Sequence, residues 1–356
     1  MTNTTAKGDT PAGGARFSPA ALPQLTPSHQ LMFFTVVGSV SRAIWALARL
    51  GVADHLADGP RTPAELAAAV GADADALARV LRAAAAFGVF AEAPGGRFAL
   101  SPAAELLRSD VPGSRRDAVL LHGEDLYWLP YRDILHTLRT GEPSFEKVYP
   151  LSYPQHLQVD DEAATLVRRA QATEHRGNLD YLTSLVDLSP FSCVAELCGD
   201  GLFLSALLRR HPHCRGTVVH RAEALPAVVA ALEAEGLPDR VDTVPADPFG
   251  PLPTETPAYL LKQVLHALDD EDAVRLLRAV REALGDGSDR RLFVLERVVG
   301  KSRPDLAAAA DLDMLLLTGG RERTEEEWRT LLEAGGFAVT DTPACKAWTA
   351  FVCRPA

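Results

Sequence analysis

The feature that most constrains the fold is the alternation of short apolar strands with amphipathic helices in the C-terminal half of the chain. Apolar runs predict strands at residues 193–197, 217–220, 241–244, 258–264 and 291–298. Apolar residues at helical spacing predict helices at 202–210, 225–235 and 270–284. Strands connected by such helices pair in parallel with right-handed crossovers. The sequence therefore predicts an α/β fold with a doubly wound parallel sheet, which segments 337–342 and 348–354 complete.

In sheets of this kind, ligands bind beyond the carboxyl ends of the strands. The residues at or just after the predicted strand ends are therefore the first candidates for a functional site. They are Gly199, His220, Asp247, His266 and Glu296.

The N-terminal part of the chain has a different pattern. Residues 31–50 form a helix whose apolar residues lie on several faces, so it is expected to pack against a second subunit. Thr62 and Glu65 match a capping box at the start of a helix, and Asp73 opens another. Residues 90–100 then read as a hairpin. Two helices and a hairpin predict a winged-helix domain.

A winged helix raises the possibility of DNA binding, because its second helix normally enters the major groove. Here that helix offers only Arg79 and Arg82, opposed by Asp73 and Asp75, and the whole chain carries a net charge of -11. Affinity for nucleic acid comes mainly from clustered Lys and Arg. We therefore expect a packing and dimerisation domain, with neither nucleic acid nor a membrane surface as a partner.

Other features of composition indicate an intracellular protein. The five cysteines are scattered and contain no CxxC pair, which favours a reducing cytoplasm. Residues 1–26 are rich in Thr, Gly, Pro and Ala and lack the apolar run of a signal peptide, so they are expected to be a disordered tail. Polar residues interrupt the best candidate for a membrane span at Ser39, Ser41 and Arg42, so no span is expected.

Five segments carry distinctive sequences, and they recur together in one protein family. They read LLRRHPH at 207–213, LPDRV at 237–241, LKQVLH at 261–266, DDEDAVRLL at 269–277 and GGRERT at 319–324. With the winged helix, they resemble the S-adenosylmethionine-dependent O-methyltransferases that modify aromatic polyketides and plant phenolics. The resemblance implies a class I, Rossmann-like methyltransferase domain at 191–356. It also implies a homodimerisation domain at 27–110 and, between the two, a helical linker and acceptor-pocket region at 111–190.

The resemblance also implies a pocket for the methyl donor at the carboxyl edge of the sheet. The residues that it assigns there are Glu196, Gly199, Gly201, His220, Asp247 and Lys262.

Three positions of that pocket depart from the family pattern. Cys198 occupies a glycine position in a turn that is one residue short. His220 replaces the acidic residue that accepts hydrogen bonds from the donor ribose, and Ala267-Leu268 replaces Asp-Trp. Glycine allows left-handed backbone and close approach of a ligand, and a neutral imidazole has one acceptor nitrogen where a carboxylate has two oxygens. Weakened binding of S-adenosylmethionine is the expected consequence.

The acid–base residues that the resemblance implies are all present. His266 aligns with the general base, and Glu296 and Glu322 align with the carboxylates that orient it. A His is suited to take a proton from a phenol because its pKa lies near neutrality, and a carboxylate on its second nitrogen fixes the tautomer. The alternative is a structural histidine at a strand end, with two solvated glutamates.

Two minor alternatives remain for other residues. His211, His213, Cys214 and His220 would supply His and Cys ligands of the kind that zinc prefers, although a surface turn explains them better. Cys198 beside a helix start would be a nucleophile, or simply a small buried residue. We expect no metal.

These observations leave three functional hypotheses. The one that we favour from the sequence is an enzyme of natural-product biosynthesis that uses His266 as a base for cyclisation, rearrangement or elimination, without methyl transfer. The second is an O-methyltransferase that modifies a phenolic hydroxyl. The third is a dimeric, non-catalytic partner protein.

Overall fold

The computed structural model describes residues 26–177, 179–302 and 305–356. The predicted tail, residues 1–26, therefore lies outside the described residues apart from Thr26. The chain divides into two compact units between Glu124 and Asp125.

Unit 1 consists of helices and one hairpin. Its elements are α1 (Pro27–Arg49), η2 (Asp54–Leu56), α2 (Pro63–Val70), α3 (Ala74–Ala86), β1 (Phe90–Ala93), β2 (Arg97–Leu100), α4 (Pro102–Glu105) and α5 (Arg116–Gly123).

The predicted local signals of unit 1 are confirmed. Thr62 and Glu65 form a capping box at α2, and the Asp73 side chain accepts a hydrogen bond from the backbone N–H of Ala76 at α3. Strands β1 and β2 pair antiparallel, with Phe90 opposite Leu100. Helix, helix and hairpin thus follow one another as in a winged helix.

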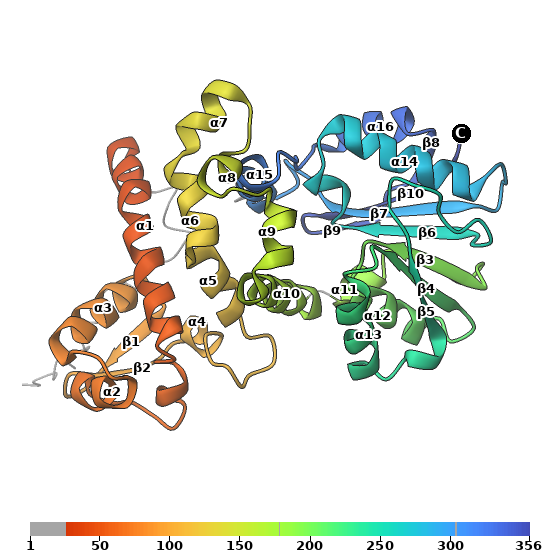
Figure 1. The fold of residues 1–356 in the computed structure, drawn as a ribbon. Helices are drawn as coiled ribbons and strands as arrows, with labels where there is room; N and C mark the ends of the chain where they lie inside the picture. Colours follow the sequence, from red (N-terminus) through yellow and green to blue (C-terminus); the bar gives the residue numbers. More distant parts are fainter. Residues whose placement is uncertain (1–25, 178, 303–304) are drawn as a thin grey trace, which may run out of the picture. The chain divides into compact units, whose positions relative to one another are not determined.

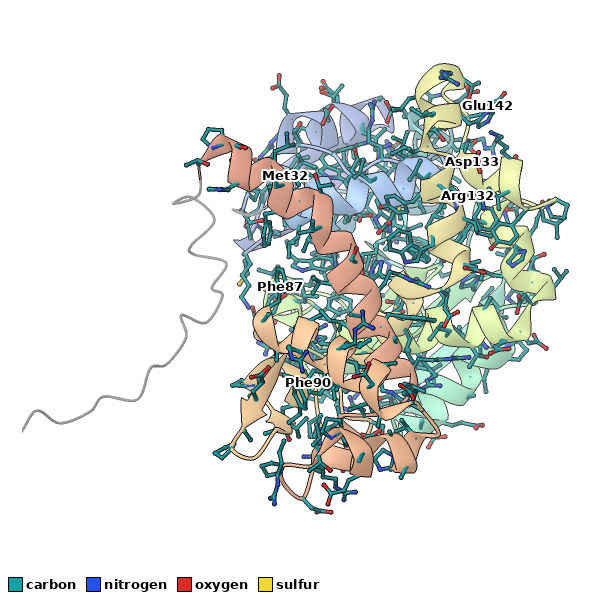
Figure 2. All side chains as sticks on the ribbon, turned by 90° about the vertical axis from the view of Figure 1, so that its left-hand side faces the viewer. Met32, Phe87, Phe90, Arg132, Asp133 and Glu142 are labelled. Atoms are coloured by element: carbon teal, nitrogen blue, oxygen red, sulfur yellow. The ribbon has the colours of Figure 1, made fainter. Side chains whose placement is uncertain are left out.

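Helix α1 exposes large apolar side chains. Leu31 is 69% exposed and Phe34 is 57% exposed, and Met32, labelled in Figure 2, lies on the same helix. By length and composition α1 is long and apolar enough to cross a membrane, and 11% of its most apolar stretch is buried. The expectation that no segment is long and apolar enough to span a membrane is therefore wrong by length and composition. Some other surface is needed to cover this helix.

Unit 2 begins with six helices and continues into the predicted alternation of strands and helices. The first helices are α6 (Asp125–Arg132), α7 (Ile134–Thr140), α8 (Ser144–Val148), α9 (Tyr153–Val159), α10 (Asp161–Arg176) and α11 (Leu179–Thr183). The strands are β3 (Cys193–Leu197), β4 (Arg215–His220), β5 (Val241–Pro245), β6 (Ala258–Lys262), β7 (Arg291–Arg297), β8 (Phe337–Asp341), β9 (Ala344–Cys345) and β10 (Trp348–Pro355). The intervening elements are α12 (Leu202–Arg210), α13 (Leu225–Ala234), η3 (Pro238–Arg240), η4 (Leu265–Ala267), α14 (Asp270–Leu284), α15 (Leu306–Leu317) and α16 (Glu325–Ala334).

The strands form one sheet in the order β5-β4-β3-β6-β7-β10-β8, with β9 paired to β10. The pairs from β5 to β7 are parallel, as predicted. The sheet is nevertheless mixed, because β10 runs antiparallel to both β7 and β8. Only a short connection separates β8 from β10, and such a connection permits antiparallel pairing without a crossover helix.

Helices cover both faces of this sheet. Figure 1 shows α14 and α16 on one face and α11, α12 and α13 on the other. Each face has its own apolar core: Trp328 and Phe351 belong to one, and Phe203 and Phe293 to the other. In this doubly wound arrangement the carboxyl ends of the parallel strands, and the turns that follow them, lie along one edge of the sheet.

The predicted end of β6 is wrong by two residues. The strand was expected to reach Val264, but it ends at Lys262. Gln263 has a φ of 53°, in the left-handed region that a continuing strand excludes. The chain therefore turns earlier than its apolar pattern indicates, and η4 follows with His266.

Candidate functional site

The three predicted acid–base residues come from three separate segments at one edge of the sheet. His266 lies in η4 between β6 and α14, Glu296 is the penultimate residue of β7, and Glu322 precedes α16. One ligand atom from each lies within 4.8 Å of the other two. The fold therefore assembles a cluster from residues far apart in the sequence.

Hydrogen bonds give the two carboxylates different partners. His266 Nδ1 lies 2.9 Å from Glu322 Oε1. Glu296 Oε1 accepts the backbone N–H groups of Val264 at 3.1 Å and Leu265 at 3.0 Å. Glu322 thus contacts the imidazole directly, whereas Glu296 holds the backbone just before it.

Burial makes this cluster electrostatically sensitive. Glu296 is 0% exposed and Glu322 is 4% exposed, and the second oxygen of each has no hydrogen-bond partner among the described residues. Burial, together with the charge of Glu322, raises the pKa of Glu296 to about 7. Burial by itself lowers the pKa of His266. The charge of Glu296 and the hydrogen bond with Glu322 raise it by a larger amount, so the pKa of His266 is raised overall. The imidazole side chain is still 14% exposed. It is the member of the cluster that a ligand would reach.

The turn after β3 keeps glycine-like backbone in spite of its cysteine. Cys198 has a φ of 59°, and Gly201, with a φ of 79°, is the N-cap of α12. A Cβ at Gly199 would lie 2.2 Å from the carboxyl carbon of Glu196. A left-handed residue other than glycine costs roughly 1–2 kcal/mol. The strained geometry expected from the sequence is therefore present at Cys198.

Glu196 and Lys262 are buried beside this turn. Glu196 is 1% exposed and accepts the Gly201 N–H at 3.2 Å. Its burial, and then the charge of Asp200, raise its pKa to about 8. Lys262 is 7% exposed and donates to the Gln263 side chain at 3.0 Å, and burial lowers its pKa to about 8. Both residues lie at the ends of neighbouring strands, although the sequence predicted Lys262 inside a strand that continues to Val264.

His220 and Asp247 lie at the ends of the next two strands. His220 Nδ1 accepts the backbone N–H of Arg221 at 2.8 Å, and burial lowers the pKa of the ring. The neutral ring therefore carries its proton on Nε2, so it presents a donor where the resembled family presents an acid. Asp247 accepts the N–H of Phe249 at 3.1 Å.

One group of described residues has the spacing of a metal site. Among the described residues, only His266, Glu296 and Glu322 come close enough to share an ion. The Nδ1 atom of His266 already contacts Glu322, so the geometry is that of an oriented base. The alternative metal cluster of His211, His213, Cys214 and His220, all four of which the structure describes, does not assemble.

Sequence reasoning missed two residues that support the cluster. Asp311 on α15 accepts the backbone N–H of Glu322 at 2.7 Å. Arg323 is 1% exposed although it lies in a segment rich in charged residues. The only signal for Arg323 was its place in the GGRERT motif.

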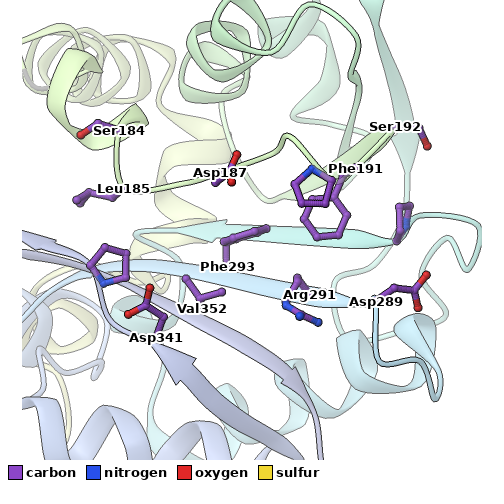
Figure 3. Close-up of a pocket in the computed structure, with 13 residues that line it drawn as sticks. Ser184, Leu185, Asp187, Phe191, Ser192, Asp289, Arg291, Phe293, Asp341 and Val352 are labelled. Atoms are coloured by element: carbon purple, nitrogen blue, oxygen red, sulfur yellow. The ribbon is translucent and has the colours of Figure 1, made fainter.

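A cavity of about 570 Å³ lies elsewhere in unit 2. Figure 3 shows its walls around Arg291 and Phe293, in the first half of β7, and the Ser184–Ser192 segment. It contains none of the predicted site residues, and it lies at the start of β7 whereas Glu296 lies near the end of that strand.

Comparison with known proteins identifies the chain's relatives. The family model for the O-methyltransferase domain matches residues 131–338, and the model for the O-methyltransferase dimerisation domain matches residues 35–110. Phenazine O-methyltransferase of Lysobacter antibioticus is 37% identical over 302 residues, which cover 84% of this chain and 88% of that protein. The 8-amino-8-demethylriboflavin N,N-dimethyltransferase of Streptomyces davaonensis is 37% identical over 348 residues, covering 95% and 99%.

Solved structures agree with the same assignment. One similar structure is an O-methyltransferase from neocarzinostatin biosynthesis in complex with S-adenosylmethionine and 2-hydroxy-5-methyl naphthoic acid. It has a TM-score of 0.77 and 30% identity, and the match covers 89% of this chain and 96% of that one. Another is the mitomycin 7-O-methyltransferase, with a TM-score of 0.86, 30% identity, and coverage of 95% and 100%. The chain therefore belongs to the O-methyltransferase family of natural-product biosynthesis, with a class I methyltransferase domain and an N-terminal dimerisation domain.

Proposed function

We propose that this protein transfers a methyl group from S-adenosylmethionine to a hydroxyl group of a small aromatic acceptor. The observation that supports this proposal most directly is the contact between His266 Nδ1 and Glu322, beside the buried Glu296. Its relatives act on aromatic substrates such as 3-amino-4-hydroxybenzoate and a dihydroxynaphthoate. We infer a cytoplasmic reaction, because all five cysteines are free thiols.

The donor edge of the sheet would hold S-adenosylmethionine with altered contacts at Cys198 and His220. Gly199 and Gly201 let the turn pack closely, because a Cβ at Gly199 would collide with the Glu196 side chain and one at Gly201 with that of Leu232, and both precede the N-terminus of α12. Asp247 and Lys262 lie at the ends of the neighbouring strands and would complete the pocket. His220 would offer the ribose one N–H donor in place of two acceptor oxygens. The donor, once bound, supplies an electrophilic methyl group.

The residues of the chain handle the proton of the acceptor. Nε2 of neutral His266 accepts the hydroxyl proton, which leaves the acceptor oxygen nucleophilic. The Nδ1–H donates to Glu322, which fixes this tautomer and stabilises the imidazolium that forms. Glu296 anchors the backbone of the turn through Val264 and Leu265.

A reaction of the same base without methyl transfer is the second candidate. The strained Cys198 and the donor tautomer of His220 favour it, whereas the activities of the relatives favour methyl transfer. Incubation with S-adenosylmethionine carrying a deuterated methyl group and a panel of hydroxybenzoates and hydroxynaphthoates separates the two. Deuterium in a product supports the transferase, and a product formed without the donor supports the second candidate.

We expect kcat/KM to rise with pH, because only neutral His266 accepts a proton. Since the pKa of His266 is raised, the midpoint of the profile is expected above the ordinary value of about 6.5. Glu322→Gln removes one cause of the raised pKa, so the midpoint should move to lower pH while the plateau falls. Initial rates measured from about pH 5 to about pH 9, on either side of the ordinary histidine value, check both effects. A wild-type midpoint well below that ordinary value would contradict the assignment of His266.

We also propose that α1 pairs with a second copy of the chain. Its exposed apolar side chains lie partly within the segment that matches the dimerisation domain. Phe34→Glu should place a charge in this interface and produce monomers at micromolar concentration, because a buried aromatic anchor of an interface contributes about 2 kcal/mol or more. Sedimentation velocity measures the change, and Val229→Glu, at a residue of α13 that is 39% exposed and lies outside the matched segment, is the control. A stable wild-type monomer would exclude the pairing.

A further inference from the structure

The segment from Gly319 to Thr324 lies directly along the turn that carries His266. Gly320 approaches so closely that a Cβ there would lie 2.2 Å from the carbonyl oxygen of His266. The backbone N–H of Arg321 donates to that same oxygen at 2.7 Å. The segment therefore holds the backbone of His266 and also supplies Glu322, which contacts its ring.

The guanidinium of Arg323 is the main side-chain link between this segment and the turn. It donates to the carbonyl oxygens of Leu265 and Leu268, each at 3.2 Å, on either side of His266. It also contacts one carboxylate oxygen of Asp270 at 2.6 Å and 3.0 Å, at the first residue of α14. A fifth hydrogen bond, to the Arg321 carbonyl at 3.1 Å, stays within the segment from Gly319 to Thr324. All three guanidinium nitrogens are thus engaged with defined acceptors.

The surroundings of Arg323 prevent it from taking other positions. The side chain is 1% exposed, and its guanidinium carbon lies 4.9 Å from the centre of the Trp328 ring. The Arg323 carbonyl accepts the N–H of Val299, just after β7. Only an arginine can present its donors in this planar, forked arrangement.

We propose that Arg323 is a positioning residue that holds the turn at 265–270 in the position where His266 Nδ1 contacts Glu322. Arg323 makes no hydrogen bond to the imidazole; it acts through three points of the turn. Its effect on turnover rests on the proposed function, because it assumes that His266 is the base. Its effect on the geometry of His266 does not.

The test compares Arg323→Gln, Arg323→Lys and wild type in the full-length protein with ¹⁵N-labelled histidine. A His266→Gln sample assigns the His266 signal, and Glu322→Gln shows the signature of a ring without its carboxylate. In Arg323→Gln we expect loss of the downfield Nδ1 proton and a fall of the His266 pKa by about one unit. Arg323→Lys should retain part of both, because an ammonium reaches fewer of the acceptors. Arg329→Gln, at an exposed residue of α16, is the matched control and should leave both unchanged.

Kinetics give the second measurement. A misplacement of about 1 Å costs up to about a hundredfold in rate, so Arg323→Gln should lower kcat by that order and leave KM nearly unchanged. A folded Arg323→Gln protein with the wild-type proton signal and pKa would overturn the proposal. If activity persists in His266→Ala while Arg323→Gln still shifts the signal, the base assignment fails and the positioning role stands.

Arg323→Gln removes a buried cation, so a second variant covers the case in which it does not fold. Asp270→Ala removes the two bonds to the carboxylate and keeps those to the Leu265 and Leu268 carbonyls. We expect the His266 proton signal and pKa to change in the same direction as in Arg323→Gln, by a smaller amount. A wild-type proton signal and pKa in Asp270→Ala would then overturn the proposal.

Discussion

Replacing His266 with Ala should lower kcat about a hundred- to ten-thousandfold, the usual contribution of a general acid–base group. The ring is the only titratable member of its cluster that contacts a carboxylate and is still partly exposed, at 14%. The large loss is expected because the other two members of the cluster cannot replace it: Glu296 and Glu322 are buried and bonded to the backbone and the ring. Steady-state kinetics with a confirmed acceptor measure the change.

Two comparisons make this result specific. His213→Ala, at an exposed histidine of the same protein, should keep full activity, and circular dichroism checks that each variant folds. Glu322→Gln should cost more than Glu296→Gln. In Glu296→Gln the new amide oxygen would still accept the two backbone N–H groups at the start of the turn, whereas Glu322→Gln removes the charge that stabilises the imidazolium. Full activity in a folded His266→Ala protein would remove the base from the mechanism.

Replacing His220 with Glu should tighten the binding of S-adenosylmethionine about ten- to a hundredfold, because hydrogen bonds to charged groups contribute about 1.5–3 kcal/mol each and about 1.4 kcal/mol is a tenfold change in affinity. The imidazole has one donor to offer because its Nδ1 accepts the Arg221 N–H, whereas a carboxylate would accept from both ribose hydroxyls. Calorimetric titration measures both proteins under the same conditions.

The control for this prediction keeps the change in charge and moves it away from the site. His213→Glu alters net charge as His220→Glu does, but at an exposed position outside the donor turn. We expect its affinity to equal that of the wild type. Wild-type protein that retains the donor through purification without added ligand would contradict weak binding, and equal affinities of wild type and His220→Glu would contradict the role of His220.

The sequence by itself determined the local helix starts, the parallel strands and the edge of the sheet where the candidate site lies. Some signals depend only on a few neighbouring residues, such as the caps at Thr62 and Asp73 and the apolar runs of the parallel strands. The structure therefore contains these features as the sequence predicted. The rule that ligands lie beyond the strand ends then directed attention to His220 and His266 from the sequence alone. The resemblance to a family added Glu322, which no local pattern distinguishes from the other glutamates.

Only the tertiary structure decided how these residues meet. The motif GGRERT contains two arginines, and nothing in it indicates that Arg323 is buried at 1% exposure while the Arg321 side chain is 55% exposed. The left-handed Gln263 ends β6 before its apolar pattern does, and β10 inserts antiparallel between β7 and β8. His266 and Glu322 are 56 residues apart in the chain. Contacts across such separations depend on packing of the intervening elements, which local periodicity and capping do not encode.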